Sequence, residues 1–165
     1  MSEIYLVFVV FLFVLAVFDL MVGVSNDAVN FLNSAIGAKV AKFRTIIIVA
    51  AVGVFMGATM SNGMMEVARN GVFHPAMFSL KELMFIFLAV MISDVILLDI
   101  FNNLGLPTST TVSLVFELLG GTTAFVLLKL ANDTTGLTVG DLMNTEKALG
   151  MIMAIFVSVA IAFFF

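Results

Sequence analysis

Long apolar runs alternate with short polar connections along the whole chain. Each run is close to the ~20 residues that a helix needs to cross the hydrocarbon core of a bilayer. The runs cover residues 4–24, 45–65, 83–104, 108–131 and 148–165. This pattern predicts an all-α polytopic membrane protein with about five transmembrane segments, which together form a single transmembrane domain over residues 1–165.

The first apolar run continues directly into a stretch that is polar on one side. At a helical period of ~3.6 residues, one stripe contains Asp19, Gly23, Asn26, Asn30, Asn33 and Gly37, with Asp27 and Ser34 beside it. Because the opposite side is apolar, we expect residues 25–44 to form a half-inserted, re-entrant amphipathic helix. An ionisable group at membrane depth costs at least ~2.5 kcal/mol and is rarely kept without a task such as binding an ion or a substrate.

A second interruption lies between Leu104 and Thr111. Pro107 has no N–H and fixes φ, so a helix can begin here but cannot run through undisturbed. Four hydroxyl residues, 108–111, then occupy the first turn, where free backbone N–H groups and the positive end of the helix dipole favour an anion. Taken alone, Ser and Thr at this place are also explained as ordinary helix caps. The segment predicts a Pro-broken helix at membrane depth.

The third apolar run carries carboxylate and amide side chains just before this break. Asp99, Asn102 and Asn103 share one helical face, and Asp94 lies at its margin. Asp94 and Asp99 point ~140° apart, so they do not form the carboxylate pair of an intramembrane hydrolase, and we expect no enzyme. Hard oxygen ligands suit a small alkali cation, whereas hydroxyls at a helix start suit an oxyanion. The combination indicates a cation and an anion carried together.

Composition supports a membrane transporter. The chain is 62% hydrophobic and 11% charged, against ~25% charged residues in soluble domains. It contains no Cys and no nucleotide-binding loop, and nothing in it suits a nucleic acid. Lys129, near a helix end, is the only basic residue inside a predicted span, so a bound oxyanion needs a co-bound cation to offset its charge. We expect no cofactor beyond a co-transported Na⁺ or H⁺.

Three basic residues close the connection after the first span. Lys39, Lys42 and Arg44 are three of only seven basic residues in the chain. The positive-inside rule assigns this connection to the cytoplasm. We therefore expect a multi-pass protein of the cell membrane whose amino terminus lies outside.

Both polar stretches resemble the signature sequences of the inorganic phosphate transporter (PiT) family, whose members are symporters driven by Na⁺ or H⁺. The first is Gly23-x-x-Asn26-Asp27-x-x-Asn30 followed by Gly37, and the second is Pro107-x-Ser109-x-Thr111 followed by Gly120. Gly57-Ala58 and Arg69-x-Gly71, between them, are also similar to that family. The resemblance implies a transporter of inverted repeats that holds phosphate between the signatures of its two repeats.

The resemblance also implies roles for individual residues. Substrate-binding candidates are Asp27, Ser109, Thr110 and Thr111. Cation-binding candidates are Asn26, Asp27 and Asn30, where a Na⁺ ion is expected. Asp99 and Asn103 are further cation-binding candidates because of their hard side-chain oxygens, not because of the resemblance. The expected partners are inorganic phosphate, Na⁺ or H⁺, and the lipid bilayer.

The chain departs from the family pattern in three respects. Val112 stands where the family commonly has His, and the span 45–65 has no acidic residue. Each signature occurs once, although the family carries two repeats in one polypeptide. We expect this chain to be the first half of an inverted-repeat transporter, completed by a second repeat in a longer polypeptide or another subunit. A homodimer is the less favoured arrangement, because the basic bias gives a single orientation.

Two other functions fit the same residues. Helix dipoles and hydroxyls distinguish tetrahedral oxyanions only loosely, so sulfate or another oxyanion is an alternative to phosphate. A non-transporting membrane subunit is the second alternative, in which the polar stripes bind neighbouring helices.

Overall fold

The structure is a computed structural model that describes residues 2–61, 66, 71–132 and 136–165. Two features of the sequence analysis lie outside the described residues: Arg69 of the Arg69-x-Gly71 element, and the end of the second span at residues 62–65.

Among the described residues, five helices are long and apolar enough to cross a membrane. They are α1 (Ser2–Gly37), α2 (Phe43–Met60), α4 (Leu80–Leu104), α5 (Thr110–Ala131) and α7 (Thr145–Phe164). Two short helices, η2 (Pro75–Met77) and α6 (Val139–Leu142), lie in the connections. The prediction of an all-helical protein with about five spanning segments is confirmed.

The first helix is much longer than its apolar run. We expected a span to end near Val24, but residues 25–37 continue α1 without a break. At ~1.5 Å per residue its 36 residues extend ~54 Å, well beyond a hydrocarbon core of ~30 Å. The helix continues because its polar side chains find partners in it or on α4: Ser25 Oγ donates to the carbonyl oxygen of Met21 at 2.7 Å, and Asn26 bonds to Asn102. Residues 38–42 then form the turn into α2.

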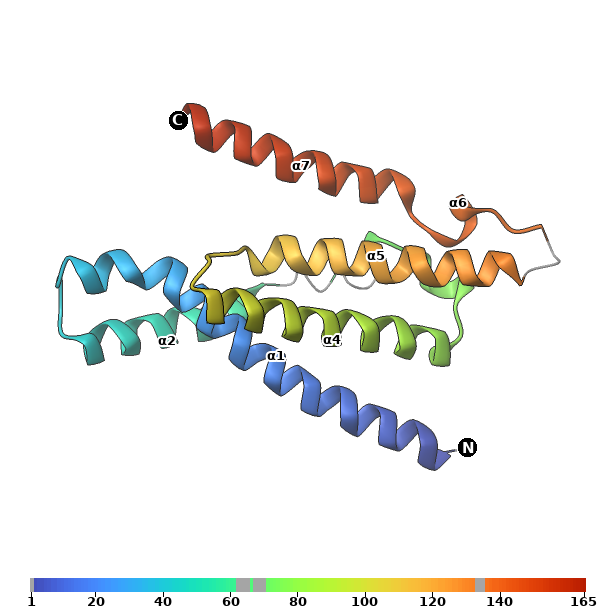
Figure 1. The fold of residues 1–165 in the computed structure, drawn as a ribbon, viewed down its shortest axis with the longest axis horizontal. Coiled ribbons are helices and arrows are strands. Elements are labelled where there is room, and N and C mark those ends of the chain that lie inside the picture. Colours follow the sequence, from blue (N-terminus) through green and yellow to red (C-terminus); the bar gives the residue numbers. More distant parts are fainter. Residues whose placement is uncertain (1, 62–65, 67–70, 133–135) are drawn as a thin grey trace.

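α1, α4 and α5 form the centre of the molecule (Figure 1). α1 packs on α4, and α4 packs on α5, which runs in the opposite direction to both. α2 pairs with the carboxyl-terminal half of α1, and this hairpin extends beyond the end of the α4–α5 pair. The break between α4 and α5 therefore lies part-way along the long axis of the molecule rather than at its tip.

The buried apolar core lies toward the other end of the α4–α5 pair. A buried cluster there contains residues of α4, α5, the segment before η2, and α6, including Phe73, Ile86, Leu118, Val126 and Leu142. An isolated β-bridge between Phe73 and Met143 ties the two connections together. This apolar cluster holds the helix ends in place.

A charged contact closes the same end. Lys129, in the last turn of α5, lies 3.0 Å from Glu82 of α4 and donates to the carbonyl oxygen of Met77 at 2.9 Å. Its ammonium group also lies 4.9 Å from the ring centroid of Phe78. The ammonium group thus meets polar partners at the helix end, as a snorkelling lysine does.

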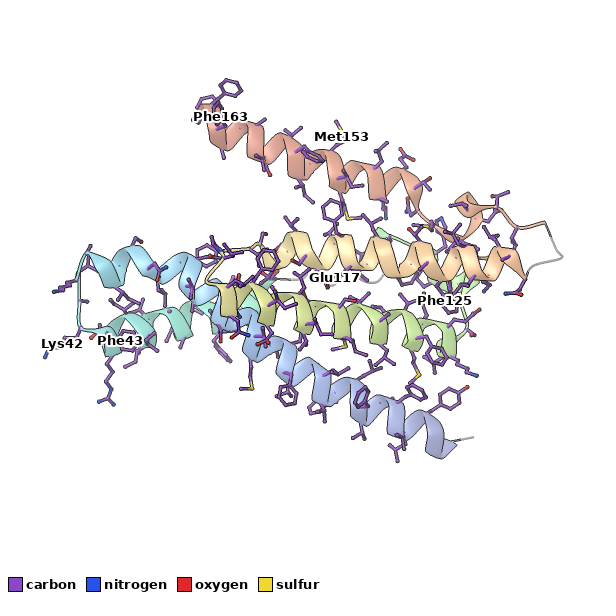
Figure 2. The ribbon with its side chains drawn as sticks, in the orientation of Figure 1. Lys42, Phe43, Glu117, Phe125, Met153 and Phe163 are labelled. Carbon is purple, nitrogen blue, oxygen red and sulfur yellow. The ribbon has the colours of Figure 1, made fainter. Side chains whose placement is uncertain are left out.

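Apolar side chains cover the outside of the bundle (Figure 2). Phe13 of α1, Phe55 of α2 and Phe156 of α7 are 71%, 71% and 64% exposed. Such surfaces are favourable against lipid and not against water. The fold therefore agrees with a multi-pass membrane protein.

Candidate transport site

The helix break predicted at Pro107 is present, and local residue chemistry explains it. α4 ends at Leu104, and Gly105 follows with φ of +66°, a left-handed conformation that a residue with a Cβ adopts only with strain. α5 begins at Thr110, and the Oγ of Ser109 caps it by accepting from the N–H of Val112 at 3.3 Å. Residues 105–109 are consequently non-helical and lie between two helix ends.

Hydrogen bonds of amide side chains join α1 to the end of α4 and to this break. Asn26, 2% exposed, donates from Nδ2 to Oδ1 of Asn102 at 2.9 Å. Asn30 Nδ2 donates to Oδ1 of Asn26 at 3.2 Å and to the carbonyl oxygen of Thr108 at 2.8 Å. Asn102 Nδ2 in turn donates to the carbonyl oxygen of Val22 at 3.2 Å. The ladder satisfies buried amides and fixes the break beside α1.

Asp27 connects the first signature to the second. Oγ1 of Thr110 donates to Oδ1 of Asp27 at 3.2 Å, across 83 residues of sequence. Thr110 is the first residue of α5, so the carboxylate lies near the positive end of that helix dipole. A negative group at this position is stabilised by the helix start in the way an oxyanion is.

A cavity of about 270 Å³ adjoins this contact. It is lined by Asp19, Leu20, Gly23, Val24, Asp27, Asp94, Leu98, Thr110, Thr111 and Leu114. Its walls come from α1, α4 and α5, and no Lys or Arg is among the lining residues. An anion entering here would meet hydroxyls, a helix start and carboxylates, with no fixed positive side chain.

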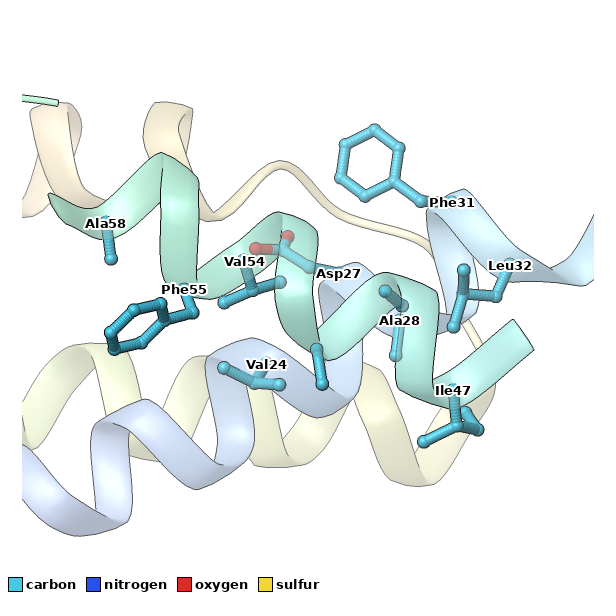
Figure 3. A pocket seen from close by; sticks show the side chains of 11 residues that line it. Val24, Asp27, Ala28, Phe31, Leu32, Ile47, Val54, Phe55 and Ala58 are labelled. Carbon is cyan, nitrogen blue, oxygen red and sulfur yellow. The ribbon is translucent and has the colours of Figure 1, made fainter. Parts of the chain in front are cut away.

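Asp27 also lines a larger groove of about 540 Å³ between α1 and α2 (Figure 3). The other lining residues are apolar, among them Phe31 and Leu32 of α1 and Val54 and Phe55 of α2. The Asp27 carboxylate is the polar group of this groove, so Asp27 lies between an apolar opening and the cavity beside α5.

The structure brings together most of the predicted site residues. Asp27, Thr110 and Thr111 line one cavity, Asn30 bonds to Thr108 in the adjoining break, and Asn26 bonds to Asn102 in the last turn of α4. Ser109 lies at the same helix start, where its hydroxyl is used as a cap.

Asp99 and Asn103 lie elsewhere. They bond to each other, Asn103 Nδ2 to Asp99 Oδ2 at 3.1 Å, on an exposed face outside the cavity lining. Asn102, on the neighbouring face of α4, is the amide that meets α1. From the sequence we expected all three on one face, because side chains one residue apart differ by only ~100° around a helix.

The site prediction omitted three acidic residues that the structure places close by. Asp19 and Asp94 line the 270 Å³ cavity, and Glu117 of α5 approaches Asp94. Sequence signals existed: Asp19 belongs to the polar stripe of α1, and Asp94 lies at the margin of the polar face of α4. Their convergence depends on how three helices pack.

The described residues do not include three or more His, Cys, Asp or Glu side chains arranged to hold a metal ion. An alkali cation would therefore depend on amide, hydroxyl and carbonyl oxygens together with one or two carboxylates, ligands that such hard cations accept.

Comparison with known families agrees with this geometry. The model of the Phosphate transporter family matches residues 23–165, which include both signature stretches, the break and all residues of the cavity lining except Asp19 and Leu20. The chain belongs to the phosphate transporter family. The resemblance inferred from the two signatures is thus confirmed at the level of the family. No curated protein matches the chain, and no solved structure does. Membership supports a membrane transporter of phosphate and is consistent with a protein that is not an enzyme.

Proposed function

We propose that this chain forms one phosphate-binding repeat of a secondary symporter coupled to Na⁺ or H⁺. Phosphate binds at the start of α5, to the free backbone N–H groups there and to the hydroxyls of Ser109, Thr110 and Thr111. A cation binds at the oxygens of Asn26, Asp27 and Asn30. A second repeat completes the site.

The observation that carries this proposal is the hydrogen bond from Thr110 to Asp27 at 3.2 Å. It joins the two signatures at a helix start beside a cavity lined by residues of three helices. Broken helices whose ends face a cavity are the usual means of holding ions at membrane depth.

The same contact supports a reason for coupling. The Asp27 carboxylate lies near the positive helix end that an anion would use, and no basic side chain lines the cavity. A phosphate bound at this helix start and an ionised Asp27 repel each other, because both are negative and both lie at the same helix end. A Na⁺ or a proton on Asp27 removes that repulsion, so the cation and the anion bind favourably only together.

The roles predicted for Asp99 and Asn103 have less support. Their side chains bond to each other on an exposed face of α4 and do not line the cavity. They remain predictions from the side-chain chemistry of the sequence.

Uptake of radiolabelled phosphate by the complete polypeptide in proteoliposomes tests the proposal. Asp27→Asn is expected to abolish the dependence of uptake on an imposed Na⁺ or proton gradient, because the neutral amide no longer needs a cation. Asp141→Asn is the control, since that carboxylate caps α6 in a connection outside the spans and hydrogen-bonds to Thr138.

The hydroxyl prediction uses a matched pair on α5. Thr111→Ala is expected to weaken phosphate binding by ~1 to 3 kcal/mol, roughly 5- to 150-fold. Thr123→Ala, which removes a hydroxyl bonded to the carbonyl oxygen of Leu119 on the same helix, is expected to leave it unchanged. Equal phosphate uptake by Asp27→Asn, Thr111→Ala and the parent protein would refute the site, and stronger competition by sulfate than by unlabelled phosphate would reassign the substrate.

A further inference from the structure

Three carboxyl groups from three helices converge inside the bundle. Asp19 of α1 and Glu117 of α5 both approach Asp94 of α4. Asp94 is only 6% exposed, and it lines the 270 Å³ cavity together with Asp19. Glu117 lies on the side of α5 that faces α4 (Figure 2). We call these three residues the carboxyl cluster.

The cluster lacks the partners that buried carboxylates normally have. Oδ1 of Asp19, Oδ1 of Asp94 and both carboxyl oxygens of Glu117 are buried and accept no hydrogen bond from the described residues. The ion pair between Glu82 and Lys129 lies at the far end of α4, and no ion pair in the described part of the chain includes a cluster residue. Buried carboxylates without donors or counter-charges are strongly disfavoured.

Titratable groups on the described helices around the cluster offer no compensation. On α1 the titratable residue that follows Asp19 is Asp27, eight residues or ~12 Å along the helix, and its side chain is also acidic. On α4 the next is the exposed Asp99. α5 carries one other titratable side chain, Lys129, which pairs with Glu82. α7 contributes Glu146 and Lys147 in its exposed first turn, and between residues 45 and 60 α2 has no titratable side chain.

We propose that Asp19, Asp94 and Glu117 form a proton-binding site that stays partly protonated at neutral pH. Like charges this close cannot all ionise in an apolar bundle, so neighbouring carboxyl groups share protons. A shared proton also supplies the missing hydrogen-bond donor. Protons suit the cluster better than a metal ion, because the described side chains are not arranged as a metal site.

The cluster is separate from the proposed phosphate site but opens to the same cavity. Asp19 and Asp94 share the lining with Asp27, Thr110 and Thr111. Protons released or taken up by the cluster therefore change the charge that an anion meets beside α5. The existence of the proton site does not require that the chain transports phosphate.

Infrared spectroscopy of the complete protein in lipid vesicles tests the proposal. A protonated carboxyl group gives a carbonyl absorption distinct from that of an ionised carboxylate. We expect this absorption to persist at neutral pH in the parent protein, and to be reduced or lost in Asp94→Asn and in Glu117→Gln. Glu82→Gln is the matched control and is expected to leave it unchanged, because the ion pair with Lys129 keeps Glu82 ionised.

Isotope labelling gives a second test that needs no substitution, so it holds even if a cluster variant does not fold. In the parent protein, glutamate labelled with heavy carbon at the carboxyl group is expected to shift part of the absorption, because Glu117 shares the protons. Absence of the absorption at neutral pH in the parent protein would overturn the proposal. So would an absorption that survives in both cluster variants and disappears in Asp27→Asn, since the proton would then belong to the phosphate site.

Discussion

Asn26 and Asp27, adjacent residues of the first signature, contact different helices. The amide of Asn26 donates to Asn102 and accepts from Asn30, and the residue is 2% exposed. The neighbouring Asp27 points instead toward the start of α5, where Thr110 donates to it. The two adjacent residues therefore differ in their contacts. Asn26 links α1 to α4, whereas Asp27 lines the cavity.

Asn102→Ala tests the link between α1 and α4. The change removes the acceptor of the Asn26 amide and leaves a buried donor unpaired, at a cost of ~1 to 3 kcal/mol. We expect a lower thermal unfolding temperature for the purified protein in detergent. The adjacent Asn103→Ala, which removes only an exposed bond to Asp99, is expected to leave that temperature nearly unchanged. Equal destabilisation by both variants would contradict the amide ladder.

At the scale of elements, α4 and α5 depend on a close approach at Gly121. A Cβ at this position would lie 3.3 Å from Cγ2 of Val90 and 3.9 Å from the carbonyl oxygen of Ile86. Small residues let helix backbones approach in lipid, where dispersion contacts replace the hydrophobic effect. Gly120, one residue earlier, faces open space. The side of α5 that contains Gly121 therefore packs against α4. This contact sets the position of α5 relative to α4, and with it the position of the cavity and the break.

The two glycines give a matched pair of variants. Gly121→Leu is expected to destabilise the protein by about 1 to 3 kcal/mol, because the larger side chain overpacks the α4–α5 contact. Gly120→Leu should be tolerated, since a Cβ at that position would meet no packed neighbour within 4 Å. Thermal unfolding of the two variants measures the difference. A larger loss for Gly120→Leu would show that the α4–α5 pair is rotated from the arrangement described above.

At the scale of the whole molecule, the ends of the helices fall into two groups. The amino terminus, η2 and α6 lie at one end of the long axis, and the turn between α1 and α2 lies at the other (Figure 1). That turn contains Lys39 and Lys42, so the positive-inside rule assigns it to the cytoplasm. The arrangement is compatible with an amino terminus outside the cell, which remains a prediction.

Cysteine labelling tests the orientation directly, because the chain has no native Cys. Ala41, in the α1–α2 turn, and Ala76, in η2, are both exposed. We expect Ala41→Cys to react with a membrane-impermeant maleimide only from the cytoplasmic side, and Ala76→Cys only from outside. The opposite result would reverse the predicted orientation, whereas labelling of both from one side would contradict the arrangement of the helices.

Much of this architecture follows from local sequence. Apolar runs of spanning length predict membrane helices because lipid leaves backbone groups no partner except those within the helix. The break at Pro107 follows from the missing N–H of proline and from the capping hydroxyl of Ser109. Likewise, the two signature stretches were sufficient to predict the family, which the match over residues 23–165 confirms.

Contacts between helices that are distant in the sequence could not be predicted in this way, because they depend on packing angles that no local sequence pattern contains. The polar residues after Val24 led us to expect a new segment, yet α1 continues because α4 supplies Asn102 as a partner for Asn26. The same packing separates Asp99 from the cavity and brings Asp94 to Asp19 and Glu117. Helical periodicity predicts which side of a helix is polar, whereas the partner of each polar group is set only when three helices pack together.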